Sequence, residues 1–119
     1  TVTVDKNGNN ALSKKFDAAN VATYGLSAPD TGDAWGQTYW AGLANSNGFK
    51  YLDKNPWGTK YYYDSPALAQ VFAWIAKGVK AGWIMDPRKT GGLGTTELWN
   101  AGKLVSSWKG SWEINDTLR

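Results

Sequence analysis

The sequence predicts an α/β fold in which helices pack on a small mixed sheet. A short β-type segment at residues 21–27 is followed by a helical pattern at residues 33–45. A second helical pattern, at residues 65–80, carries apolar side chains at helical spacing from Leu68 onward. Residues 102–114 then read as a helix end, a short strand, a turn and a new helix.

The chain begins with a β-like segment and a turn. Residues 1–4 alternate between threonine and valine, which favours a strand. Asp5, Asn7 and Asn9 fall at the first, third and fifth places of a calcium-binding loop. Phe16 stands at the twelfth place, where such a loop needs glutamate. We therefore expect a plain turn, with calcium binding as the alternative.

Residues 21–27 favour a buried strand, and a turn rich in small and polar residues follows it. Asp33 is expected to cap a helix that runs to about Asn45. Trp35 lies in the first turn of this helix, so we expect it to be less buried than Trp40 in the middle.

Residues 49–52 and 60–63 read as the two sides of a hairpin with a structural role. Neighbouring side chains of a strand point to opposite faces. Only alternate members of the tyrosine run at residues 61–63 can therefore act together.

The clearest element is a helix with Ser65 as its N-cap and Pro66 at its first position. Gly82 is expected to end it. We assign the helix to the scaffold. One face is expected to be buried against a sheet, and it carries Leu68, Val71, Phe72, Ile75 and Val79.

A glycine-rich loop at residues 90–94 precedes a short helix that Thr95 or Thr96 is expected to cap. The loop lacks the third glycine of a dinucleotide-binding fingerprint. Leu104 follows Gly-Lys where a P-loop needs serine or threonine. Neither segment predicts a phosphate site.

Residues 102–114 contain the main candidate site. Gly102 suits a helix C-terminus, residues 104–108 suit a strand, and Ser111 suits the cap of a helix that starts near Trp112. Ligands of α/β proteins usually lie beyond the carboxyl end of a strand, facing the next helix. The flat apolar face and polar edge of Trp112 suit a sugar ring there. The alternative, that Trp112 packs inward, stays open.

Composition excludes several function classes. The 119 residues contain neither cysteine nor histidine, which removes thiol nucleophiles, imidazole bases and the usual zinc sites. There are thirteen basic residues and ten acidic ones, but no basic run is longer than the two residues of Lys14-Lys15, so we expect no nucleic-acid partner. Eight tryptophans and six tyrosines exceed what a core of this size needs.

Five motifs follow one another along the chain: N-V-A-T-Y-G-L at 20–26, N-S-N-G-F-K-Y-L-D at 45–53, D-S-P-A at 64–67, K-A-G at 80–82, and W-N-A-G-K at 99–103 leading to G-S-W at 110–112. In this order they resemble the bacterial extracellular solute-binding proteins of the sugar-binding, maltose-binding-protein-like kind. Members of that family deliver sugars to ABC transporters. The chain departs from the family in Trp99, where phenylalanine is commoner, and in residues 105–107, which are more polar than the usual strand.

The resemblance implies that residues 1–119 form a single domain, the central segment of the C-terminal lobe of a periplasmic-binding-protein type II fold. We therefore expect the chain to be part of a longer protein that is a cell-surface lipoprotein or periplasmic. The resemblance implies neither a cofactor nor a metal. The residues that it implies bind ligand are Trp112 and Trp35 as stacking platforms, with Asp33, Asp30, Gly110, Ser111 and Glu113.

The implied function is capture of a mono- or oligosaccharide without chemistry, followed by delivery to a membrane permease through the full-length protein. By itself the chain is expected to bind sugar weakly or undetectably, and self-association of the lobe stays open. A stand-alone carbohydrate-binding module is one alternative, although such modules are usually all-β. A glycosidase fragment is the other. It would need two facing carboxylates, for which Asp30, Asp33, Glu97, Glu113 and Asp116 are candidates.

Overall fold

The computed structural model describes residues 2–28, 34–54 and 56–118, and of residues 34–38, 113, 116 and 117 it describes the backbone alone. The protein is a mixed α/β structure, as the sequence predicts. It divides into two compact units, one made of Thr1–Ala28 with Lys77–Arg119 and the other of Pro29–Ala76. The expectation of a single domain stays a prediction.

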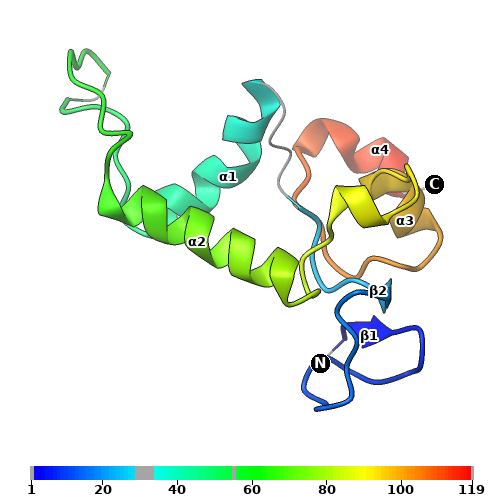
Figure 1. Cartoon of the computed structure of the whole chain (residues 1–119). Helices are drawn as coiled ribbons and strands as arrows, with labels where there is room; N and C mark the ends of the chain where they lie inside the picture. Colours follow the sequence, from blue (N-terminus) through cyan, green and yellow to red (C-terminus); the bar gives the residue numbers. More distant parts are fainter. Residues whose placement is uncertain (1, 29–33, 55, 119) are drawn as a thin grey trace. The chain divides into compact units, whose positions relative to one another are not determined.

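The first unit is organised around residues 21–27. Strand β2 (Val21–Thr23) pairs antiparallel with β1 (Val4–Asp5), as Figure 1 shows. The chain then forms parallel bridges from Tyr24 to Leu104 and from Leu26 to Ile84. The Met85 amide donates to the Leu26 carbonyl at 2.8 Å, and the Tyr24 amide donates to the Lys103 carbonyl at 2.9 Å. Residues 21–27 are thus bridged in parallel to two other segments, whereas the sheet itself is the antiparallel pair of β1 and β2. The predicted mixed sheet stays a prediction.

A small apolar core covers these parallel segments. Helix α3 (Thr95–Asn100) contributes Leu98, which is buried together with Tyr24, Met85 and Leu104. The expected cap of α3 is wrong, because Gly94 occupies the N-cap position and makes no side-chain bond there. Gly94 has φ −82° and ψ −177°, an extended conformation that any residue can adopt.

Asp5 organises the N-terminal turn and is itself 1% exposed. Its carboxylate accepts hydrogen bonds from the backbone amides of Asn7, Asn9 and Asp17 at 2.8–2.9 Å. The side-chain amide of Asn9 donates to it as well. Burial raises the pKa of Asp5, but these donors outweigh burial, so the pKa lies below its ordinary value. The predicted turn is confirmed, and N–H donors occupy both oxygens that a calcium ion would need.

The second unit consists of α1 (Ala34–Ser46), a hairpin at residues 49–63 and the first part of α2 (Pro66–Lys80). The hairpin is confirmed by the antiparallel bridge from Leu52 to Tyr61 and projects beyond the two helices (Figure 1). The buried core contains Ala44, Phe49 and Leu68, with Trp40, Tyr51, Tyr62 and Ala67 packed against it.

Helix α2 begins and ends as predicted. The Ser65 hydroxyl accepts a bond from the Ala67 amide at 3.3 Å, and Gly82 follows the helix with φ +80°. We expect the apolar face of α2 to be buried against a sheet. This expectation is wrong for the first half of the helix, because Leu68 packs on α1 and the hairpin. Phe72, expected to be buried, is 41% exposed and makes a T-shaped contact with Trp40, with 5.2 Å between ring centroids. No helix in the described part of the chain is long and apolar enough to cross a membrane.

The end of α2 approaches the Ile84 segment closely at Gly78. A Cβ atom on Gly78 would lie 2.6 Å from Cδ1 of Ile84 and 2.7 Å from Cη2 of Trp83. Ile84 is fully buried and cannot move aside easily. The absence of a side chain at residue 78 therefore sets how closely the helix packs on this segment.

We predict that Gly78→Ala is less stable than the matched variant Gly42→Ala by about 1–3 kcal/mol. Gly42 lies within α1 and has no neighbour within 4 Å of a Cβ, so alanine there should stabilise by about 0.5–1 kcal/mol. Urea unfolding of both variants measures the difference. Equal stabilisation by the two substitutions would contradict the close packing of Gly78.

Asp5→Ala should lower the midpoint temperature of thermal unfolding. It should also make that temperature depend less on pH in the acid range. Because the pKa of Asp5 is lowered in the folded state, its stabilisation is complete above the ordinary carboxyl range and is lost as the pH falls below about 4. Circular dichroism melts from pH 7 to pH 2 test this. Asp64→Ala, at an exposed position, is the control and should keep the wild-type acid profile.

Candidate functional site

The candidate site lies at the carboxyl ends of the parallel segments in the first unit. Ser27 ends the central segment and is 2% exposed. Its hydroxyl accepts bonds from the Ser107 hydroxyl at 3.2 Å and from the Trp108 amide at 3.3 Å. The Ser27 amide donates to the Ser106 carbonyl at 3.0 Å. The bond of the Ser107 hydroxyl explains a polar side chain at that position, and together these bonds fix the chain that leads into the site.

Asp86 follows the Ile84 segment and is also buried, at 4% exposure. It caps a short 3₁₀ helix (Pro87–Lys89), and its two oxygens accept from Nε and Nη2 of Arg88 at 2.9 and 3.0 Å. The Arg88 side chain lowers the pKa of Asp86 against the opposing effect of burial. Burial, and then the charge of Asp86, raise the pKa of Tyr24.

Next to Ser107 the first unit has a cavity of about 470 Å³. Its wall combines an indole, two hydroxyls, an ammonium group and aliphatic side chains. The Nζ atom of Lys109 donates to the Thr96 hydroxyl at 3.1 Å, which ties this wall to α3. The lining residues are Trp99, Ser107, Lys109, Gly110, Ser111, Ile114 and Leu118.

The turn beside this cavity differs from the predicted one. Gly110 is the N-cap of a short 3₁₀ helix (Ser111–Glu113), which continues into α4 (Ile114–Thr117). The prediction that Ser111 caps this helix is therefore wrong, because Ser111 is its first residue. Trp112 is 59% exposed, which argues against inward packing, and its indole lies against the Cα of Gly110.

The structure places only some of the predicted site residues. Gly110 and Ser111 line the cavity, whereas Trp112 is not among the described residues that line it. Asp30 and Asp33 lie outside the described residues. The side chains of two further predicted residues, in the first turn of α1 and in the last 3₁₀ helix, are not described: Trp35 and Glu113. A ledge shared by Trp35 and Trp112 stays a prediction.

Sequence reasoning missed Trp99, Ser107 and Lys109 as site residues. In the sequence, Trp99 belongs to a motif that carries the resemblance and also departs from it, and a large aromatic at that position is the available signal. It is half-buried and packs against the core of the first unit, so its ring is held in place. The sequence does not indicate Lys109 as a site residue, because the position of its side chain depends on a contact with α3.

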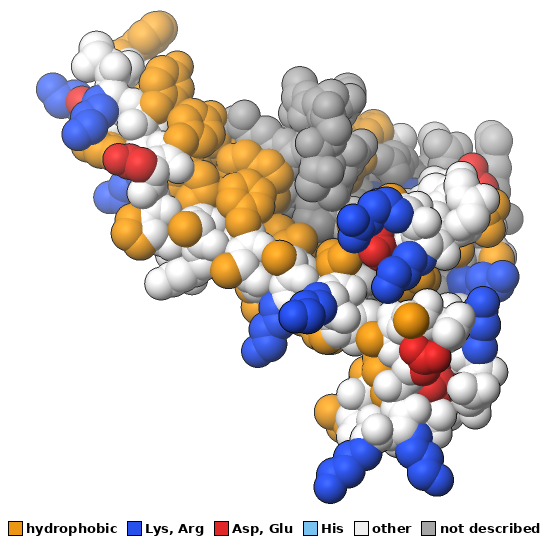
Figure 2. Space-filling model, viewed as in Figure 1, with side chains coloured by type: hydrophobic (Ala, Val, Ile, Leu, Met, Phe, Trp, Pro, Cys, Tyr) orange, Lys and Arg blue, Asp and Glu red, His pale blue; other side chains and the backbone are white. Residues whose placement is uncertain are grey.

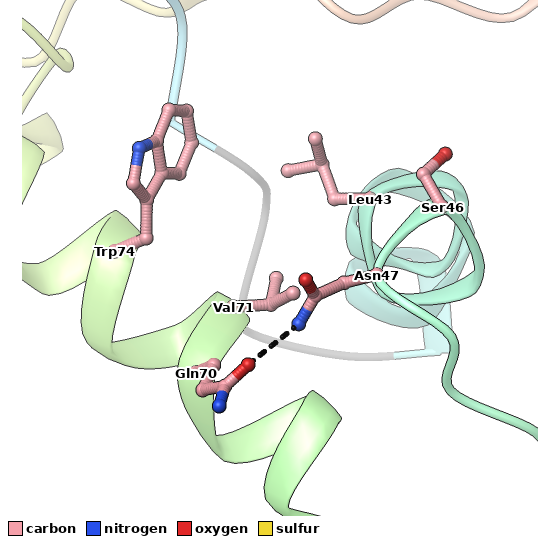
Figure 3. A pocket seen from close by; sticks show the side chains of 6 residues that line it. All are labelled: Leu43, Ser46, Asn47, Gln70, Val71 and Trp74. Carbon is pink, nitrogen blue, oxygen red and sulfur yellow. Dashed lines mark hydrogen bonds between the residues drawn. The ribbon is translucent and has the colours of Figure 1, made fainter.

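A second cavity, of about 420 Å³, lies between α1 and α2 in the second unit. Figure 3 shows the Trp74 indole and Leu43 rising on either side of it, with Val71 between them. The Asn47 amide donates to Oε1 of Gln70 at 3.1 Å and to the Ala67 carbonyl at 2.9 Å. No charged side chain is among the described residues that line it.

Comparison with protein-family models, curated proteins and solved structures finds no match. In the part of the chain that the structure describes, no group of three or more histidine, cysteine, aspartate or glutamate side chains is placed to hold a metal ion. The functional argument therefore rests on the cavity geometry and on the chemistry of its wall.

Gly110→Ala should displace the Trp112 indole. Gly110 has φ −77°, so alanine meets no backbone strain, but its Cβ would overlap the indole. We expect the Trp112 indole N–H signal to shift in a ¹H–¹⁵N NMR spectrum. Ser111→Ala is the control and should leave that signal near its wild-type position. An unmoved signal in Gly110→Ala would show that the indole does not rest on residue 110.

Proposed function

We propose that this chain is a carbohydrate-binding segment of the extracellular solute-binding component of an ABC sugar importer. The observation that carries the proposal is the cavity after the segment paired with Tyr24, which is lined by an indole and several hydrogen-bonding groups. This combination suits a sugar, which presents an apolar C–H face and a polar rim of hydroxyls.

Each group in the wall has a role in the proposed complex. The Trp99 ring provides the apolar face, and its packing on the core means that little side-chain entropy is lost on binding. The hydroxyls of Ser107 and Ser111 and the ammonium group of Lys109 provide hydrogen bonds to sugar hydroxyls. Trp112 does not line the cavity, but it is exposed in the turn that contributes Gly110 and Ser111 to it, and in this proposal it provides a second ring.

Two further features support the assignment to a binding protein lobe. The parallel bridges on both sides of residues 21–27, with α2 leading into one partner segment, are the arrangement expected of an α/β lobe. The five motifs also follow the order of the solute-binding family. In this proposal the protein acts outside the cytoplasm and passes sugar to a membrane permease.

In this proposal the chain binds sugar and does not catalyse a reaction on it. Asp86 is the buried carboxylate at this edge of the fold, and Arg88 occupies both of its oxygens. A general acid needs a raised pKa and a free proton-bearing oxygen, whereas the pKa of Asp86 is lowered. Its role is therefore to cap the 3₁₀ helix and hold the loop.

Saturation-transfer difference NMR tests the proposal, because it detects weak binding. We expect the chain to give a signal with at least one of glucose, maltose, cellobiose and xylobiose. Trp99→Ala and Trp112→Ala should each weaken binding about tenfold, or about 1.4 kcal/mol. Leu12→Ala, at an exposed position in the same unit, is the control.

Sugar capture in this cavity would be contradicted if none of the four sugars gave a signal. It would also be contradicted if Trp99→Ala, with an unchanged circular dichroism spectrum, bound sugar as well as the wild type does. Micromolar affinity of the chain alone would instead favour a self-sufficient carbohydrate-binding module, because a single lobe offers only part of a two-lobed cleft.

A further inference from the structure

The chain contains two Asn-Gly pairs, Asn7-Gly8 and Asn47-Gly48. Asparagine is one of the chemically labile residues of proteins. It is most labile before glycine, because glycine has no side chain to shield its backbone nitrogen. That nitrogen can attack the Cγ atom of the preceding asparagine. Both pairs are therefore candidate sites of spontaneous backbone modification.

The backbones of the two pairs are closely matched. Gly8 and Gly48 have φ of +82° and +86°, and neither has an atom within 4 Å of the place where a Cβ would stand. The Gly8 amide donates to the Asp5 carbonyl at 3.1 Å, and the Gly48 amide donates to the Asn45 carbonyl at 3.0 Å. Both labile asparagines are exposed. Neither backbone geometry nor access of water therefore separates the two pairs.

The side chain of Asn47 is held by α2. Its amide group donates to the Ala67 carbonyl at 2.9 Å and to Oε1 of Gln70 at 3.1 Å, and Figure 3 shows the second of these bonds. For the Gly48 nitrogen to reach Cγ, the side chain must rotate away from both acceptors. The amide group that they hold is also the group that must leave. Contact with α2 thus protects Asn47 while the chain is folded.

The side chain of Asn7 has no such restraint. Its backbone amide donates to Oδ1 of Asp5 at 2.9 Å, but among the residues that the structure describes its side chain makes no hydrogen bond. Rotation of the Asn7 side chain toward the Gly8 nitrogen therefore breaks no side-chain bond. The two pairs differ in this one respect.

We infer that Asn7 is the site at which the folded chain modifies itself, and that the bonds to Ala67 and Gln70 protect Asn47. The Gly8 nitrogen bonds to Cγ of Asn7, the Cγ–Nδ2 bond breaks, and the proton of the Gly8 amide leaves through water with the ammonia. Water then adds to either carbonyl of the succinimide ring and opens it to aspartate or isoaspartate. Water is the only co-reactant, and a carboxylate replaces the amide.

The modification falls in the turn that Asp5 organises. The backbone amides of Asn7 and Asn9 both donate to Oδ1 of Asp5, at 2.9 and 2.8 Å. Isoaspartate adds a methylene group to the backbone between these two amides, so both cannot keep their present positions. We therefore expect the turn to be less stable once Asn7 has reacted.

Peptide mapping by mass spectrometry, after incubation of the chain in mildly alkaline buffer, measures the reaction at both sites. Because two hydrogen bonds must break at Asn47, we expect Asn7 to react about tenfold faster or more in the folded chain. In urea, where these bonds are absent, the two rates should become similar. Gln70→Ala removes one acceptor and should raise the rate at Asn47 alone.

Cation exchange separates the product, because the reaction lowers the net charge of +3 by one. Figure 2 shows lysine and arginine side chains projecting from the surface of the first unit, where the exchanger can bind. The separated product should unfold at a lower temperature than the unreacted chain. Asn7→Ser is the control, since it cannot react at residue 7 and should not form this product.

Equal rates at the two sites in the folded chain, or a faster reaction at Asn47, would overturn the inference. A rate ratio that is the same in urea as in buffer would also overturn it, because the local sequence and not the structure would then set the difference. An unchanged rate at Asn47 in Gln70→Ala would contradict protection by the side-chain bonds. A product that melts like the unreacted chain would contradict the effect on the turn.

Discussion

The parallel pairing of residues 21–27 with segments on both sides is the constraint on which the first unit depends. Backbone bonds at Tyr24 and Leu26 bring together parts of the chain that lie far apart in the sequence. Once these bonds form, three segment ends meet at one edge, and the residues that follow them must share that edge. The cavity beside Ser107 lies after one of these segment ends, that of the residues paired with Tyr24.

Buried polar groups then fix the loops around this frame. Ser27, Asp86 and Asp5 are each almost fully buried, and each accepts hydrogen bonds from nearby amides or side chains. No buried side-chain nitrogen or oxygen of the described residues lacks a partner. Because an unsatisfied buried group costs about 1–3 kcal/mol, these residues specify one loop conformation over others.

The many aromatic residues fall into two groups with different roles. Some, such as Trp40, Phe49 and Tyr51, form the packed interior of the second unit. Others remain in water on a rigid support, among them Tyr61, Tyr63 and Trp112. An exposed ring held by its neighbours is prepared for stacking on a ligand.

The sequence by itself determined the α/β class, the hairpin and the bounds of the main helix. These features depend on caps, turns and apolar spacing within a few residues, as at Ser65 and Gly82. Only the tertiary structure decided that Phe72 is partly exposed, that Gly94 caps α3 and that Trp99 lines the cavity. Periodicity shows that one face of a helix is apolar, but what covers that face, and how completely, depends on contacts with distant residues.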